Sequence, residues 1–159
     1  MADNKQRLIA LIGATAATAL TVTTALWEGD KPIGYRDIKG IPTACRGIAD
    51  GTIVVGRDYS AKCDDMNAGA ALSHAQGVLK CTPRLKGYQL AAAGSLTYNI
   101  GINGYCGSTV ARRFNAGDLR GGCEAMLAWD KARIHGKVVR VRGLTNRRQY
   151  ERNLCLKGL

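Results

Sequence analysis

The sequence has few aromatic residues, few glutamates and no metal-binding cysteine motif. Aromatic side chains make up 6% of the chain, which is a small share for a protein that stacks nucleic-acid bases. Glutamate occurs only as Glu28, Glu124 and Glu151. None of the six cysteines forms a CxxC pair or has a histidine at ligand spacing, so we expect no zinc site, no other metal and no cofactor.

Basic residues outnumber acidic ones by a wide margin. The 23 lysines and arginines exceed the 12 aspartates and glutamates, which gives a net charge of +11. Such a charge predicts an anionic partner, for example nucleic acid, phospholipid, lipopolysaccharide or cell wall. A hydrophobic fraction of 46% excludes a disordered basic tail. A length of 159 residues predicts one compact domain with a modest core.

An uncharged apolar segment runs from Leu8 to Trp27, after a short polar start that contains Lys5 and Arg7. The segment is long enough to cross a bilayer. Its many alanines and threonines dilute the Leu, Ile and Val residues, so we expect it to be held only weakly in a membrane. The basic residues before it predict a cytoplasmic N-terminus, with the rest of the chain beyond the inner membrane.

Two other interpretations of this segment are open. A cleaved signal peptide would fit the basic start, and Thr23 and Ala25 are small enough for a processing site. Cleavage there would leave Glu28 almost at a frayed terminus, which is a poor place for a catalytic acid. A buried helix of a globular domain fits less well, because apolar, Ala and Thr residues occur all the way round the helix.

All six cysteines follow the apolar segment and would lie in an oxidising compartment. Disulfides are therefore expected rather than free thiols. Fifteen pairings are possible, and the sequence alone does not choose among them. The local arrangement that we expect joins Cys45 to Cys63, Cys81 to Cys106 and Cys123 to Cys155, each closed loop adding about 3 kcal/mol if unstrained.

The rest of the chain predicts a mostly helical α+β fold with a small β-hairpin lobe near its N-terminal side. Strands are expected over 33–38 and 52–55, separated by the turn residues 49–51. Helices are expected over 61–80, 87–100, 108–115, 119–129 and 146–155.

Two carboxylates directly after the apolar segment suggest acid-base chemistry. Glu28, held beside Trp27 at the end of an apolar helix, would be poorly solvated and so would keep its proton as a general acid. Asp37, in a glycine-rich polar loop, would stay ionised, and Thr43 could hold a water with its hydroxyl. Glycoside hydrolysis needs such a pair of carboxyl groups in different environments.

Four motifs in order resemble the phage-type lysozymes of glycoside hydrolase family 24. The first combines Glu28-Gly29 with the spaced set Tyr35, Asp37, Gly40, Thr43 and Gly47. The others are Leu96 to Gly101, Phe114 to Asp118, and a C-terminal block from Gly143 to Glu151. The resemblance covers the chain from Glu28 to its end, and it implies a lysozyme-like fold with an added N-terminal helix.

This resemblance implies hydrolysis of the β-1,4 bond between N-acetylmuramic acid and N-acetylglucosamine in peptidoglycan. It assigns Glu28 as general acid, Asp37 as the carboxylate that positions water or stabilises the cation, and Thr43 as its hydroxyl partner. Arg147 falls where the family has an arginine paired with the catalytic glutamate, although Arg148 is adjacent. Tyr35 and Asn99 are candidates to line the cleft or to brace it.

The apolar segment also resembles that of signal-arrest-release (SAR) endolysins, whose weakly hydrophobic helix is exported uncleaved, tethers the inactive enzyme and later leaves the bilayer. We therefore expect residues 1–27 to form the releasable membrane segment and residues 28–159 the muramidase domain. Residues 8–27 contain no cysteine, so we expect activation by release and refolding, not thiol exchange. Depolarisation of the host inner membrane by a holin or pinholin is the expected trigger, followed by release to the periplasm. We expect a monomer without a nucleic-acid partner.

Two competing functions remain at this point. A lytic transglycosylase would cleave the same bond with one glutamate and leave a 1,6-anhydro product. A non-enzymatic, membrane-tethered basic protein would bind the envelope or nucleic acid, and Glu28 would then be dispensable. The basic run from Lys131 to Arg152 fits either a solvated enzyme surface or a patch that attracts anionic lipid and wall polymers.

Overall fold

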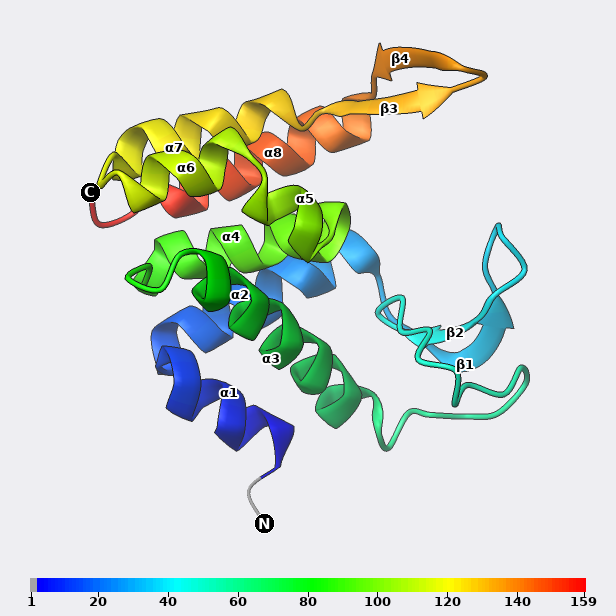
Figure 1. The fold of residues 1–159 in the computed structure, drawn as a ribbon. Helices are drawn as coiled ribbons and strands as arrows, with labels where there is room; N and C mark the ends of the chain where they lie inside the picture. Colours follow the sequence, from blue (N-terminus) through cyan, green and yellow to red (C-terminus); the bar gives the residue numbers. More distant parts are fainter. Residues whose placement is uncertain (1–2) are drawn as a thin grey trace. The chain divides into compact units, whose positions relative to one another are not determined.

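The computed structural model describes residues 3–159, which form two compact units. The N-terminal unit ends at Ser73 and the C-terminal unit runs from His74 to Leu159. Helix α3 (Cys63–Cys81) continues through this boundary. Figure 1 shows the N-terminal unit in blue to green and the C-terminal unit in green to red.

The N-terminal unit begins with two helices, α1 (Asn4–Ile12) and α2 (Ala14–Glu28), which pack against each other. Gly13 separates them with a φ of 81°, a left-handed value that favours glycine. Asp3 caps α1 by accepting a hydrogen bond from the backbone N–H of Gln6. Asn4 donates hydrogen bonds from its backbone and side chain to Asp65 of α3, so the start of the chain is fixed to α3.

The segment expected as one helix over 8–27 is therefore divided between two helices. No helix among residues 3–159 combines the length and the hydrophobicity that a bilayer crossing requires. The side chains of α2 that are buried share one helical face: Ala16, Ala17, Leu20, Thr23 and Thr24.

The threonines of α2 explain how this face can pack although it is only partly apolar. Thr21, Thr23 and Thr24 donate their hydroxyl hydrogens to backbone carbonyls four residues earlier. A threonine satisfied in this way leaves no hydroxyl hydrogen that needs another partner. The packed face thus follows the helical period, contrary to the impression that the sequence is apolar all the way round.

A two-stranded antiparallel sheet follows α2. Strand β1 (Lys31–Arg36) pairs with β2 (Pro42–Cys45), with Tyr35 opposite Thr43. The expectation of a second strand over 52–55 was wrong, because these residues form no strand. The residues that follow them bond to β1 only at separated points: Gly34 N–H donates to Arg57 and Gly56 N–H donates to Gly34. A side chain at Gly34 would collide with the Val54 carbonyl, so the loop approaches β1 closely without forming a ladder.

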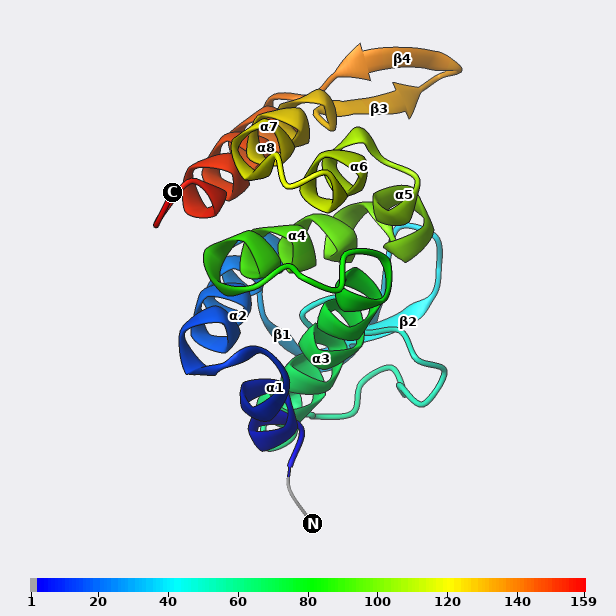
Figure 2. The same cartoon turned by 60° about the vertical axis from the view of Figure 1, so that its left-hand side comes forward.

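The C-terminal unit is mostly helical. It contains α4 (Gly87–Ile100), α5 (Ile102–Cys106), α6 (Thr109–Asn115), α7 (Leu119–Ala125), the 3₁₀ turn η1 (Met126–Ala128) and α8 (Arg142–Cys155). Nine consecutive residues of α4, from Gln89 to Thr97, are buried, so this helix is covered on all sides. In Figure 2 α4 lies below α6, α7 and α8, and it contacts α8 and α5. The expected helices over 87–100 and 108–115 match α4 and α6 closely, whereas α8 begins four residues before the expected 146.

A second antiparallel pair of strands was not expected from the sequence. Strand β3 (Lys131–Ile134) pairs with β4 (Lys137–Arg140), and the chain then enters α8. The two strands extend past the ends of α7 and α8 in both views (Figures 1 and 2).

A buried charge network holds α8 to α4. The Glu151 carboxylate is fully buried and contacts Arg147 at 3.1 Å and Arg148 at 2.9 Å, and it accepts a hydrogen bond from the Ser95 hydroxyl of α4. Burial raises the pKa of Glu151, while the charges of Arg148 and Arg147 and the Ser95 hydrogen bond act in the opposite direction. The Arg147 guanidinium also donates to the Ser95 carbonyl.

Three disulfides join Cys45 to Cys63, Cys81 to Cys106 and Cys123 to Cys155, which are the pairs predicted. Their Cα atoms lie 5.4 to 5.6 Å apart, in the ordinary range. The first links the end of β2 to the start of α3 within the N-terminal unit.

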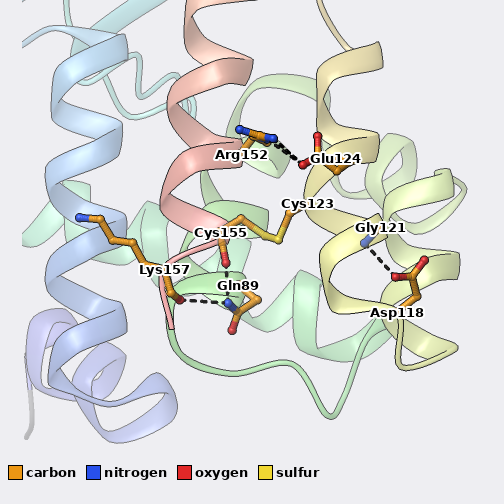
Figure 3. Close-up of a disulfide and its surroundings, with 8 residues drawn as sticks. All are labelled: Gln89, Asp118, Gly121, Cys123, Glu124, Arg152, Cys155 and Lys157. Atoms are coloured by element: carbon orange, nitrogen blue, oxygen red, sulfur yellow. Dashed lines mark hydrogen bonds and ion pairs between the residues drawn. A yellow bond between two sulfur atoms is a disulfide. The ribbon is translucent and has the colours of Figure 1, made fainter. Parts of the chain in front are cut away.

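The disulfide between Cys123 and Cys155 lies in a set of polar contacts that close the C-terminal end of α8 (Figure 3). The Gln89 side chain of α4 donates to the carbonyls of Cys155 and Lys157. Arg152 of α8 donates to Glu124 of α7, and this contact lowers the pKa of Glu124. Asp118 caps α7 by accepting from the Gly121 N–H.

Candidate active site

Glu28 is the last residue of α2, and its position depends on how that helix packs. The side chain is half-buried. Gly29 ends the helix with a φ of 70° and turns the chain towards β1. A methyl group placed on Gly47 would lie 3.9 Å from Glu28 Oε2. The carboxylate oxygen Oε2 therefore lies beside the turn that follows β2.

Asp37 lies just after β1, in the turn that leads to β2. Its Oδ1 atom accepts hydrogen bonds from the backbone N–H groups of Lys39 at 2.8 Å and Ile41 at 2.9 Å. Its own N–H donates to the Ile41 carbonyl at 3.0 Å. The turn thus fixes one carboxylate oxygen and leaves the other, Oδ2, to meet a ligand or water.

Thr43 is a buried residue of β2, opposite Tyr35 of β1. Its hydroxyl donates to the Ile41 carbonyl at 2.9 Å. Because the hydroxyl hydrogen is used in this contact, Oγ1 is oriented as an acceptor towards any further partner. Asp37 and Thr43 are linked through Ile41, which binds both.

The turn after β2 is closed by two backbone hydrogen bonds, in which Ala44 and Ile48 each donate to the other. Within it, Cys45 has a φ of 55° and Gly47 a φ of 74°. The disulfide from Cys45 to Cys63 ties this turn to α3. The strained conformation of Cys45 is thus held by a covalent bond.

Arg46 is a positioning residue that the sequence reasoning missed. Its backbone N–H donates to the Asn67 side chain of α3 at 3.2 Å, and its guanidinium donates to the Thr21 carbonyl of α2 at 3.3 Å. It therefore joins the turn that faces Glu28 to both helices. Its place next to Gly47, within the motif that resembles family 24, is the signal that could have found it.

The three predicted catalytic residues all lie in the N-terminal unit, together with Tyr35. Tyr35 is half-buried, and the Lys31 ammonium lies 4.8 Å from its ring centroid. Asn99 and Arg147 lie in the C-terminal unit, on α4 and α8. Asn99 is exposed, whereas Arg147 is buried and contacts Glu151. The predicted pairing of Arg147 with Glu28 stays a prediction.

Among residues 3–159 no group of three or more histidine, cysteine or carboxylate side chains is arranged to hold a metal ion. The chemistry available at the site comes from two carboxyl groups and a hydroxyl. One carboxyl group ends a helix and the other is oriented by backbone N–H groups. Such a set can donate a proton to a leaving oxygen and orient a water for attack.

The chain is similar in sequence to several known proteins. The phage lysozyme family matches residues 25–151. The chain is 35% identical to the SAR-endolysin of Pseudomonas phage phiKMV, over 92% of this chain and 91% of that protein. It is 37% identical to the SAR-endolysin of Enterobacteria phage H19B, over 96% of this chain and 92% of that protein.

A solved structure shows the same fold. The endolysin from Escherichia coli O157:H7 phage FAHEc1 superposes with a TM-score of 0.78 at 31% identity, covering 89% of this chain and 92% of that chain.

Proposed function

The chain belongs to the phage lysozyme family, and from this we propose that it is an endolysin that hydrolyses peptidoglycan with Glu28, Asp37 and Thr43. Its substrate is the β-1,4 bond between N-acetylmuramic acid and N-acetylglucosamine, and cleavage of the wall lyses the host cell. The assignment rests on the position of these three residues in the same structural unit. Glu28 faces the turn after β2, and Asp37 and Thr43 are both hydrogen-bonded to Ile41 just before that turn.

The reaction needs a proton for the leaving sugar and a water for the cationic centre. Glu28 donates its proton to the glycosidic oxygen as the bond to the anomeric carbon breaks. Asp37, with Oδ1 fixed by two backbone N–H groups, stabilises the positive charge or takes a proton from the attacking water through Oδ2. Thr43 Oγ1 accepts the water's other hydrogen, because its own hydrogen is given to Ile41.

The residues outside this set have supporting roles. Tyr35 lies opposite Thr43 in the sheet and braces the strand that carries it. Asn99, exposed on α4, is available to contact the glycan. Arg147 supports the catalytic glutamate, in keeping with its place in the C-terminal motif.

Mass spectrometry of purified peptidoglycan treated with the protein tests the reaction. The wild type should release muropeptides with reducing ends, and Glu28→Gln should lower the rate by at least about a hundredfold without changing the melting temperature. Glu124→Gln, at a half-buried glutamate paired with Arg152, is the matched control and should stay active. Anhydro ends would assign the protein to the lytic transglycosylases. Absence of fragments from wild type would disprove the enzymatic function.

The SAR-endolysin relatives point to a membrane-tethered precursor that is released to the periplasm. We infer that residues 8–27 provide the tether in the host inner membrane, with the N-terminus in the cytoplasm, and that residues 28–159 form the muramidase domain. A holin or pinholin that depolarises the membrane would trigger release. The threonines of α2 suit both the tethered and the released form, because their hydroxyls bond within the helix whether lipid or protein surrounds it.

Exposed threonines of α2 allow a test of the tether that leaves the packed face unchanged. Thr15 and Thr18 are exposed, so Thr15→Leu/Thr18→Leu raises the hydrophobicity of the segment while Leu20 and its neighbours stay buried. After treatment with a protonophore, the wild type should move from the membrane fraction to the periplasm, and the leucine variant should remain in the membrane. Thr15→Ser/Thr18→Ser is the control and should be released. Equal release of both variants would contradict the proposed tether.

A further inference from the structure

The β3–β4 hairpin is the most exposed regular element of the C-terminal unit. Seven of its eight strand residues are exposed, Ala132 being half-buried. His135 and Gly136 form the two-residue turn with φ values of 47° and 79°, the sign that a type I′ turn requires. The strands extend past α7 and α8 in both views (Figures 1 and 2). This geometry leaves both faces of the hairpin open to a partner.

The register sorts the hairpin's side chains into two chemically different faces. Residues opposite each other in an antiparallel pair point to the same side. Lys131, Arg133, Val138 and Arg140 therefore share one face, and Ala132, Ile134, Lys137 and Val139 share the other. The first face is cationic. The second is mainly aliphatic, with Ile134 45% and Val139 38% exposed. These two side chains are therefore not buried in the core of the unit.

The base of the hairpin is firmly attached to α8. Asp130 is buried and binds Arg140 Nε at 2.7 Å. Its carbonyl accepts from the Val141 N–H at 2.9 Å, and its carboxylate accepts from the Thr145 hydroxyl. From Lys131 to Arg142 the sequence contains five lysines and arginines and no acid. The hairpin is thus a rigid cationic projection and not a loose loop.

We propose that this hairpin docks on the surface of an anionic phospholipid bilayer. Lysine and arginine next to such a surface bind the lipid phosphates, and exposed aliphatic side chains gain free energy by entering the boundary between headgroups and acyl chains. A nucleic acid or an anionic wall polymer would match the charge but would leave Ile134 and Val139 in water. The combination of a cationic face with an aliphatic one favours lipid.

Co-sedimentation of the full-length protein with vesicles tests this proposal without using hydrolysis as the readout. The vesicles contain phosphatidylethanolamine with phosphatidylglycerol, or phosphatidylcholine alone. The charge variant is Arg133→Gln/Lys137→Gln. Its matched control is Arg57→Gln/Lys62→Gln, which removes the same charge from exposed positions of the N-terminal unit. Because residues 8–27 are present in every variant, any binding through them cancels in the comparison.

We expect the charge variant to bind the anionic vesicles at least about tenfold more weakly than wild type, since each basic residue near such a surface contributes about a fivefold change. The control should bind within about twofold of wild type. Binding to phosphatidylcholine should be weak and equal for all variants, and added salt should reduce the difference.

A second variant tests the aliphatic face. Ile134→Ser/Val139→Ser should also weaken binding to the anionic vesicles, and the residual binding should become more sensitive to salt. Peptidoglycan hydrolysis in the absence of vesicles should be unchanged in every hairpin variant, which shows that the proteins are folded. Equal binding of charge variant and control would overturn the proposal, as would an aliphatic variant that binds like wild type. A defect on peptidoglycan sacculi but not on vesicles would assign the hairpin to the wall instead.

Discussion

The two units of this protein achieve their stability in different ways. The C-terminal unit has a helix, α4, with nine consecutive buried residues, a fully buried ion network around Glu151 and two disulfides. The N-terminal unit packs α2 through alanines, one leucine and threonines, and it has one disulfide. Its polar connections, such as Asn4 to Asp65 and Arg46 to Thr21, are exposed or only partly buried.

This difference has a functional meaning, because the predicted catalytic glutamate belongs to the unit with the smaller number of disulfides. Glu28 ends the helix that we infer to leave the membrane. The packed face of α2 consists mainly of small residues and of threonines whose hydroxyls bond within the helix. These side chains need no partner from the rest of the unit when α2 is not packed against it. We infer that activity is regulated through the N-terminal unit, while the C-terminal unit serves as a constant scaffold.

The largest effect on stability should come from the buried network. Glu151→Gln leaves the positive charges of Arg147 and Arg148 without their carboxylate, and breaking such a buried pair costs about 3 to 5 kcal/mol. We expect a correspondingly large fall in the free energy of unfolding, measured by urea denaturation. Glu124→Gln, at a pair that is only partly buried, should change stability far less. If the two variants were equally stable, the network would not be the main support of α8.

Two buried leucines distinguish the scaffold from the regulated part. Leu20 of α2 is 0% exposed and Leu90 of α4 is 2% exposed, so each alanine substitution should cost about 2 to 5 kcal/mol. At a temperature where both variants are fully folded, Leu20→Ala should lose hydrolytic activity because α2 positions Glu28. Leu90→Ala should keep most of it. The rate of peptidoglycan hydrolysis per folded molecule is the measurement, and equal losses would contradict the division of roles.

A smaller effect should appear in the pH dependence of stability. Burial lowers the pKa of His74 below its usual 6.5, and its ring packs against Tyr98 with centroids 4.6 Å apart. Well above pH 6.5 the His74 ring is neutral in both the folded and the unfolded protein. As the pH falls below 6.5, the unfolded chain takes up a proton before the folded protein does, so the free energy of unfolding decreases by at most about 1.4 kcal/mol per pH unit.

His74→Asn should remove this slope between pH 6.5 and 5, measured by denaturation at several pH values. His135→Asn, at the exposed turn of the β3–β4 hairpin, is the control and should retain the slope. A slope that persists in His74→Asn would show that another group titrates in this range.

Local patterns in the sequence predicted most of the helices. The Ala- and Leu-rich segment over 87–100 became α4 with the expected bounds, and the expected helix over 61–80 became α3 within two residues at each end. Strands were predicted less well. Thr52 to Val55 has strand-forming residues, yet Pro42–Cys45 pairs with β1, because burial of Ala44 and the disulfide at Cys45 favour that segment. The β3–β4 hairpin was missed because an exposed hairpin has no core-facing pattern to reveal it.

By itself the sequence determined the spacing of Glu28, Asp37 and Thr43, the family motifs, the abundance of positive charge and the positions of most helices. These depend on neighbours along the chain, where propensity and motif spacing act directly. Only the tertiary structure decided which face of α2 is buried, where Arg46 holds the turn that faces Glu28, and that the cationic and aliphatic residues after Asp130 separate onto two faces. Each of these depends on contacts between distant residues, and a threonine-rich helix or an exposed strand has no composition that specifies its partner in advance.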